Sequence, residues 1–150
     1  FWLGLAISIA PVGAWVAIRE EISFTSLLLG AAVICWLIGF DILYACLDIE
    51  ADRANRLHSI PERFGIETAL KMAFASHAVM VVFLLVLLEP TVLLGWVYLA
   101  GVALVAGLLA YEHSLIKKDD LSKVDMAFFN VNGIISIGLM AFVIVDCVWV

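Results

Sequence analysis

Long continuous runs of apolar residues dominate the chain. Five of them approach or reach the roughly 20 residues that an α-helix needs to cross a bilayer. They cover residues 1–18, 24–47, 72–88, 90–111 and 126–145. The apolar residues follow one another without the alternation of a barrel strand, and each run is about twice as long as such a strand. The pattern predicts an all-α, integral membrane helical bundle with five transmembrane helices.

Composition narrows the class of protein further. Of the 150 residues, 65% are hydrophobic and 15% are charged, and the mean hydropathy is +1.15. Soluble domains average about 45–50% apolar and about 25% charged residues. These values exclude a soluble domain, a disordered segment, a collagen and a disulfide scaffold. No basic cluster could follow a phosphate backbone, so we expect the lipid bilayer, and no nucleic acid, as a partner.

Basic residues are unevenly distributed among the polar segments. Seven of the eight fall in two segments that are separated by two predicted spans, so both segments face the same side. These bases are Arg53, Arg56, Arg63, Lys71, Lys117, Lys118 and Lys123, and the opposite side keeps only Arg19. By the positive-inside rule we expect a multi-pass protein of the inner (plasma) membrane, with segment 41–65 facing the cytoplasm.

A stripe of acidic residues begins at the end of the second run. Tyr44, Asp48 and Asp52 follow Asp41 at offsets of three, seven and eleven residues. On one continuous helix all four would share a face over about 16 Å. Three like charges repel one another, whereas a divalent cation would join them, and magnesium commonly bridges one or two carboxylates to phosphate oxygens. The spacing is typical of a magnesium–phosphate site, of a solvated acidic helix, or of a proton or cation pathway in a transporter.

The next residues add positive charge and a helix signal. Arg53, Arg56 and Arg63 could hold a diphosphate through bidentate hydrogen bonds, or serve only as positive-inside anchors. Ser59 precedes an Ile-Pro pair and should end one helix or begin the next. His58 could bond a phosphate oxygen or cap a helix. His77 lies inside a span, where we expect it to bond a neighbouring helix.

The acidic segment resembles a known family motif. The run D-x-x-Y-A-x-x-D-x-x-x-D-R, followed by H-S-I-P-x-R-F-G, is similar to the second aspartate-rich motif of the UbiA superfamily of membrane prenyltransferases. Within the family the likeness is to 4-hydroxybenzoate polyprenyltransferases and to related menaquinone-pathway enzymes. It extends over the whole chain and implies the C-terminal part of a nine-helix bundle. The first aspartate-rich motif is not among these residues, so we expect an N-terminal half of the same enzyme as a partner and an inactive isolated fragment.

The resemblance also implies a reaction and roles for the site residues. Family members transfer a prenyl group from polyprenyl diphosphate to an aromatic acceptor, here 4-hydroxybenzoate for ubiquinone biosynthesis, with Mg²⁺ as cofactor. Asp48 and Asp52 would hold the metal, and Asp41 would complete that site or help deprotonate the phenol. Tyr44 would orient an aspartate or shield the cation. The diphosphate-binding set would be Arg53, Arg56, His58, Ser59 and Arg63, with His58 near a position where the family often has lysine.

Overall fold

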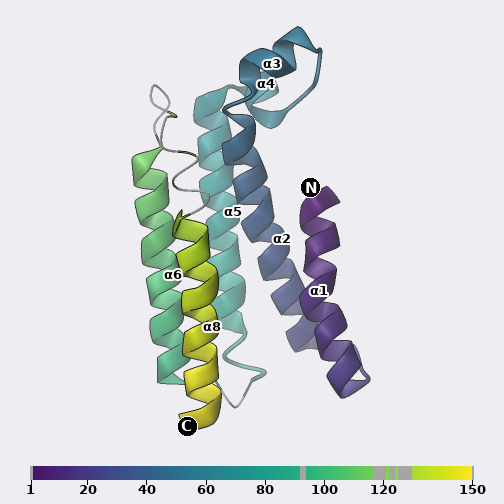
Figure 1. Ribbon diagram of the computed structural model, residues 1–150, viewed down its shortest axis with the longest axis vertical. Coiled ribbons are helices and arrows are strands. Elements are labelled where there is room, and N and C mark those ends of the chain that lie inside the picture. Colours follow the sequence, from purple (N-terminus) through teal and green to yellow (C-terminus); the bar gives the residue numbers. More distant parts are fainter. Residues whose placement is uncertain (1, 92–93, 117–120, 122–123, 125–129, 150) are drawn as a thin grey trace.

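Helices make up most of the part of the chain that the computed structural model describes, which is residues 2–91, 94–116, 121, 124 and 130–149. Seven helices and no strand occur in these residues (Figure 1). The helices are α1 (Trp2–Arg19), α2 (Phe24–Ala45), α3 (Ile49–Ala54), α4 (Ile60–Phe64), α5 (Ile66–Val86), α6 (Trp96–Leu115) and α8 (Asn132–Trp149). The prediction of an all-α protein is therefore confirmed.

The long helices have the length and composition of membrane spans. In the described part of the chain, α2, α5, α6 and α8 are long and apolar enough to cross a bilayer, and α1 contributes a shorter apolar helix, Gly4–Arg19. Many of their large side chains face outward, such as Ile18 (80% exposed) on α1 and Ile137 (66% exposed) on α8. An outward apolar surface is expected where lipid or further helices of a bundle surround the protein.

The helices begin and end at residues that differ from the spans predicted from the apolar runs, because polar contacts determine where they start. Helix α5 begins at Ile66 rather than at residue 72, because Lys71 Nζ donates to Glu67 Oε1 at 2.8 Å and supports a polar first turn. Helix α6 runs over 96–115 rather than 90–111, because its start is fixed from α8, where the Asp146 carboxylate accepts hydrogen bonds from the backbone N–H groups of Gly95 and Tyr98. Helix α8 occupies 132–149, and residues 126–129 of the predicted span lie outside the described residues.

Helix α2 is central to the packing. It lies between α1 and α5, while α6 packs against α5 and α8 (Figure 1). The main core includes Leu28 of α2, Met80 of α5 and Val105 of α6. At Gly101 of α6 the close approach of α8 requires glycine, since an added Cβ would lie 2.7 Å from the Phe142 Cβ.

A second core lies at one end of the bundle. It joins Cys46, which follows α2, to Ala69 of α5 and to Ile116, which follows α6. Helices α3 and α4 lie at this same end, whereas α1, which ends at Arg19, finishes toward the other (Figure 1). The two basic segments were expected on one side, and the ends of α2 and α6 agree with that arrangement. Lys117, Lys118 and Lys123 lie outside the described residues.

Candidate functional site

The acidic segment is not one continuous helix, so that prediction is wrong. Helix α2 ends at Ala45, with Asp41 and Tyr44 in its last turns, and Asp48 is the residue before α3. The last turn of α2 tightens because the Leu47 N–H bonds the Tyr44 carbonyl at 2.9 Å, three residues back instead of four. The stripe is therefore divided between two helices that meet at a turn.

Helix α3 carries the two remaining aspartates one turn apart. The Asp52 N–H bonds the Asp48 carbonyl at 2.8 Å, so both side chains lie on one face of the short helix. Asp48 occupies the position that normally caps a helix, yet within the described residues its carboxylate makes no capping hydrogen bond. Asp48 is exposed and Asp52 is half-buried. Both acids are thus accessible from solvent, and Asp48 is not used to terminate α3.

The end of α3 holds an arginine in an unusual conformation. The Leu57 N–H bonds the Asp52 carbonyl at 2.8 Å and the Arg56 N–H bonds the Arg53 carbonyl at 3.3 Å. This is a Schellman motif, which usually places glycine where Arg56 stands. Arg56 has φ of +56°, in the left-handed region that disfavours residues with a Cβ by about 1–2 kcal/mol. A strained arginine that follows two aspartates so closely along the chain points to a use for its side chain.

Helix α4 begins as its sequence predicts. The Ser59 hydroxyl accepts a hydrogen bond from the Glu62 N–H at 3.4 Å, and Pro61 lies in the first turn, where its missing N–H costs nothing. His58 Nδ1 lies 3.6 Å from Glu62 Oε2, but the imidazole is 83% exposed. Gly65, with φ of +81°, ends α4 and starts α5, which turns the chain back into the bundle.

A cavity of about 330 Å³ lies between α2 and the segment before α4. It brings together three of the predicted site residues, Asp41, His58 and Ser59. Asp41 is half-buried, whereas His58 is exposed. The rest of the lining is apolar: Ile38, Ile42, Ala45 and Ile60. The cavity therefore offers a carboxylate, an imidazole and a hydroxyl beside apolar walls, at the end of the bundle.

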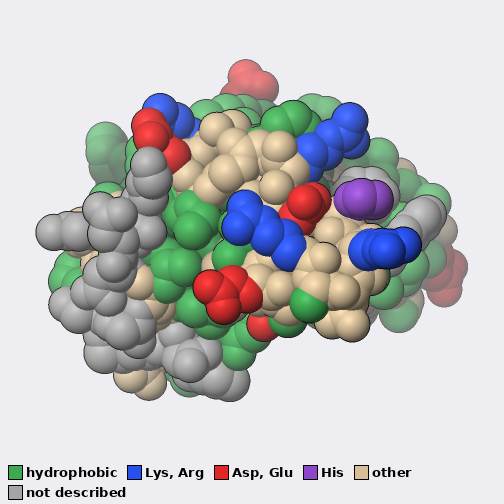
Figure 2. All heavy atoms as spheres, turned by 90° about the horizontal axis from the view of Figure 1, so that it is seen from above, with side chains coloured by type: hydrophobic (Ala, Val, Ile, Leu, Met, Phe, Trp, Pro, Cys, Tyr) green, Lys and Arg blue, Asp and Glu red, His purple; other side chains and the backbone are tan. Residues whose placement is uncertain are grey.

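The other predicted residues are not in the lining of this cavity. Tyr44, Arg53, Arg56 and Arg63 are exposed. The Arg63 guanidinium lies 5.5 Å from the centre of the Phe64 ring. Seen onto this end of the molecule, acidic, basic and histidine side chains gather on one face (Figure 2). This end of the molecule therefore carries exposed charged side chains, and the cavity at Asp41 is largely apolar.

The donor set suits a hard cation that other groups complete. Among the described residues, no group of three or more His, Cys, Asp or Glu side chains is arranged to hold a metal ion. Asp41, Asp48 and Asp52 therefore do not make a closed ligand set by themselves. Magnesium usually keeps waters and takes only one or two carboxylates together with phosphate oxygens. The accessible pair Asp48 and Asp52 fits that requirement.

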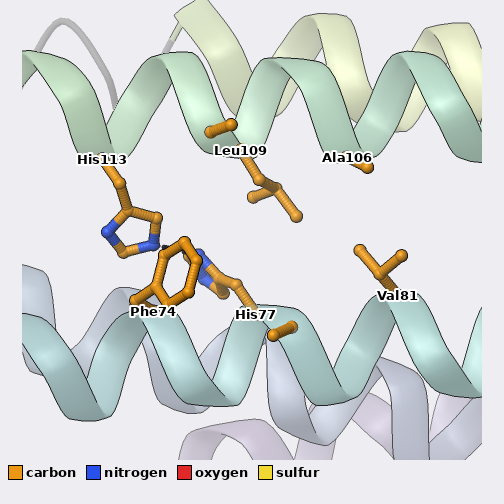
Figure 3. A pocket seen from close by; sticks show the side chains of 8 residues that line it. Phe74, His77, Val81, Ala106, Leu109 and His113 are labelled. Carbon is orange, nitrogen blue, oxygen red and sulfur yellow. Dashed lines mark hydrogen bonds between the residues drawn. The ribbon is translucent and has the colours of Figure 1, made fainter.

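A second cavity, of about 230 Å³, lies between α5 and α6. His77 of α5 and His113 of α6 line it and point toward each other, with Nδ1 of His77 3.0 Å from Nε2 of His113 (Figure 3). His77 Nε2 also lies 3.2 Å from the Trp36 carbonyl oxygen of α2. The prediction that His77 bonds a neighbouring helix is confirmed. Its pairing with His113 was missed, because nothing in the spacing indicates that residues 36 positions apart meet.

Comparisons with known proteins point in one direction. The sequence model of the UbiA prenyltransferase family matches residues 1–134. A 4-hydroxybenzoate octaprenyltransferase of Marinobacter nauticus is 32% identical over 131 residues, which are 87% of this chain and 44% of the relative. The enzyme of that name from Cupriavidus metallidurans is 28% identical over 132 residues, covering 85% of this chain and 42% of the relative.

A third relative carries the same name, and it too is matched over only part of its length. A 4-hydroxybenzoate octaprenyltransferase of Burkholderia mallei is 26% identical over 143 residues, which cover 93% of this chain and 49% of that protein. The chain thus spans less than half the length of the curated relatives it matches. No solved structure gives a significant match.

Proposed function

The chain belongs to the UbiA prenyltransferase family, and from this premise we propose that it is the C-terminal part of a Mg²⁺-dependent membrane polyprenyltransferase. The enzyme would transfer the prenyl group of a polyprenyl diphosphate to the ring of 4-hydroxybenzoate. One observation carries the proposal. The Leu57 to Asp52 hydrogen bond places the strained Arg56 directly after the helix that presents Asp48 and Asp52. The proposed metal ligands and a proposed diphosphate ligand would therefore lie on one short segment, which supports a metal–diphosphate site.

The charged surface would bind the donor. Asp48 and Asp52 would hold Mg²⁺, with Asp41 completing the site, and the bound ion would neutralise the diphosphate as a leaving group. The diphosphate oxygens would be bound by Arg53, Arg56 and Arg63, together with His58 and Ser59. Guanidinium groups suit this role because they keep their charge and pair with phosphate in a bidentate manner. The apolar helices would hold the prenyl tail within the bilayer.

The reaction would exchange one bond for another at the allylic carbon. The C–O bond to the diphosphate breaks, a C–C bond forms to the ring carbon ortho to the phenol hydroxyl, and the ring proton leaves. Asp41, which lines the cavity, would help remove the proton from the phenol. Tyr44, in the last turn of α2, would orient an aspartate or shield the allylic cation with its ring.

The acceptor and the pathway rest on the relatives. Those quoted above are named for 4-hydroxybenzoate, which supports this acceptor and a place in ubiquinone biosynthesis. A menaquinone-pathway acceptor is the alternative within the family. We further propose that an N-terminal half supplies the facing aspartate-rich motif, and that the charged end faces the cytoplasm at the inner membrane. Both follow from the family resemblance and from the clustering of basic residues.

An assay of prenyl transfer tests the proposal. The complete polypeptide would be reconstituted in vesicles with a polyprenyl diphosphate and radiolabelled 4-hydroxybenzoate. We expect a lipid-extractable labelled product that depends on Mg²⁺ and disappears with a chelator. Product formed only from a menaquinone-pathway acceptor would support the alternative. Absence of product with either acceptor, in protein that is folded and inserted, would refute the assignment.

A further inference from the structure

Two neighbouring residues of α5 bind two neighbouring carbonyl groups of α2. Ser76 Oγ donates to the Cys35 carbonyl at 2.7 Å, and His77 Nε2 lies 3.2 Å from the Trp36 carbonyl. Side-chain hydrogen bonds to helix carbonyls between spans are stabilising in a membrane, where water cannot replace them. These two bonds fix the height and the rotation of α2 against α5.

The histidine pair extends this arrangement to a third helix. A carbonyl oxygen only accepts, so a neutral His77 carries its proton on Nε2 and leaves Nδ1 as an acceptor. His113 Nε2 must then donate to His77 Nδ1, across 3.0 Å (Figure 3). The hydrogen-bonded chain runs from α6 through α5 to α2. His113 thus holds His77 in the orientation that binds the Trp36 carbonyl.

The backbone of α2 is shaped to receive the His77 ring. A Cβ added at Gly39 would collide with the imidazole, so only glycine admits the ring at this depth. Phe40 packs edge-to-face on the same ring, with centroids 4.9 Å apart. The contacts fall on a single face of α2, at Trp36, Gly39 and Phe40. The helix is gripped over the turn that directly precedes Asp41.

The gripped face lies opposite the face that lines the first cavity. At about 100° per residue, Asp41 lies about 140° and Ala45 about 180° around the helix from Trp36. Both line the cavity with His58 and Ser59. A rotation of α2 that weakened its contacts with His77 would turn Asp41 away from His58 and Ser59 by the same angle. The hydrogen bonds on one face therefore set the direction of the carboxylate on the other.

We infer that Ser76, His77 and His113 form a clamp that positions the Asp41 end of α2 for the metal–diphosphate site. None of the three lines the Asp41 cavity, so they act as positioning residues. The part of the inference that concerns catalysis rests on the proposed function. The part that concerns the placement of α2 does not, since it follows from the contacts alone.

Cys46 provides a reporter of the placement of α2. It follows the last turn of that helix and is 1% exposed. In a background carrying Cys35→Ala and Cys147→Ser, Cys46 is the remaining thiol of this chain. Its rate of alkylation by N-ethylmaleimide then measures how often this end of α2 moves and exposes the thiol. We expect His77→Leu and Gly39→Ala to raise the alkylation rate at least tenfold. His77→Gln should stay near the parent, because its amide can donate to the Trp36 carbonyl and accept from His113.

A matched glycine controls for the change of residue. Gly107 lies in α6, and no atom of the described residues lies within 4 Å of an added Cβ, so Gly107→Ala should leave the alkylation rate unchanged. In the assay of the complete polypeptide, His77→Leu should raise the half-saturating Mg²⁺ concentration by about 10- to 100-fold, as loss of a supporting partner does at other metal sites. The KM for the aromatic acceptor should stay near the parent value.

The two readings separate the clamp from the proposed function. Unchanged Cys46 alkylation in both His77→Leu and Gly39→Ala would overturn the clamp, whatever the activity. Faster alkylation with an unchanged Mg²⁺ requirement would overturn its link to the metal–diphosphate site. If the parent protein transfers no prenyl group, but His77→Leu and Gly39→Ala still raise the alkylation rate, the placement of α2 by the clamp would be supported and the proposed function refuted.

Discussion

Polar side chains inside the bundle and polar side chains at its charged end are held in opposite ways. Asp146 is fully buried, and its carboxylate accepts hydrogen bonds from the Gly95 and Tyr98 backbone. His77 is 2% exposed and meets two partners. At the charged end, Asp48 is exposed and does not cap its own helix within the described residues, and Arg56 is exposed in a strained conformation.

The difference separates stability from function. Burying a polar group without a partner costs about 1–3 kcal/mol, so a polar residue inside the bundle must be paired to be tolerated. Asp146 and His77 are therefore explained by the helices that they join. Exposed acids that do not join helices contribute little to the stability of the bundle, and their arrangement is better explained by a ligand. Mutations in the two regions should consequently fail in different ways.

The largest effect is expected from the acids of α3. Asp48→Asn with Asp52→Asn should lower kcat/KM for prenyl transfer by at least about 100-fold, because both proposed metal ligands lose their charge. The thermal unfolding midpoint in detergent should not fall. Glu50→Gln is the control, since Glu50 is exposed on the opposite face of the same helix and its loss should leave activity near the parent. Equal losses in the control and the double variant would mean that only the net charge of α3 matters.

Removal of the buried acid should affect stability instead. Asp146→Ala deprives two backbone N–H groups at the start of α6 of their acceptor, at a cost of about 2 kcal/mol in the free energy of unfolding. Thermal denaturation in micelles should show a clearly lower midpoint, while activity measured well below that midpoint persists. The neighbouring exposed Cys147 supplies the control Cys147→Ala, which should unfold like the parent. A catalytic defect in Asp146→Ala protein that is fully folded would contradict the distinction between stabilising interior residues and functional residues at the charged end.

Substitution of Arg56 should have smaller effects, and it should weaken diphosphate binding without lowering stability. Arg56→Gly removes a charged hydrogen-bond donor, and we expect the KM for the diphosphate to rise about tenfold. Glycine also relieves the left-handed strain, so the unfolding midpoint should stay equal or rise. Arg56→Ala is the matched variant, because it loses the same guanidinium but keeps the strain. If Arg56→Gly bound diphosphate like the parent, Arg56 would be no more than a positive-inside anchor.

The smallest effect is expected at Tyr98. Its hydroxyl donates to the Leu84 carbonyl at 2.8 Å between α6 and α5. Tyr98→Phe keeps the ring and removes that bond, which should lower the free energy of unfolding by about 1 kcal/mol without changing either KM. Leu84→Ala would be a poor control because it also opens a cavity, so Tyr111→Phe at an exposed position serves better. A change in KM for Tyr98→Phe would contradict a purely structural role.

The sequence predicts the helices well and the site in part. Apolar runs indicate the spans directly, because lipid leaves few alternatives to a helix. Ser59 and Pro61 also predict the start of α4. The turn after Ala45 was not predicted, since a helical period describes Asp41 and Asp48 equally well whether or not the helix continues between them. The boundary of α6 at Trp96 depends on Asp146, some 50 residues later, and no local pattern contains such a contact.

Binding of a metal–diphosphate at the charged end tests the central claim most directly. Mn²⁺ can stand in for Mg²⁺, and its free form is measured by electron paramagnetic resonance while a polyprenyl diphosphate is added to the complete polypeptide in micelles. We predict that the diphosphate and the protein together lower free Mn²⁺ by more than the sum of what each lowers alone. Asp48→Asn with Asp52→Asn should abolish this additional uptake, while Glu50→Gln should keep it. Equal uptake by the parent and the double variant would contradict the account, because the metal–diphosphate would then bind without the two carboxylates of α3.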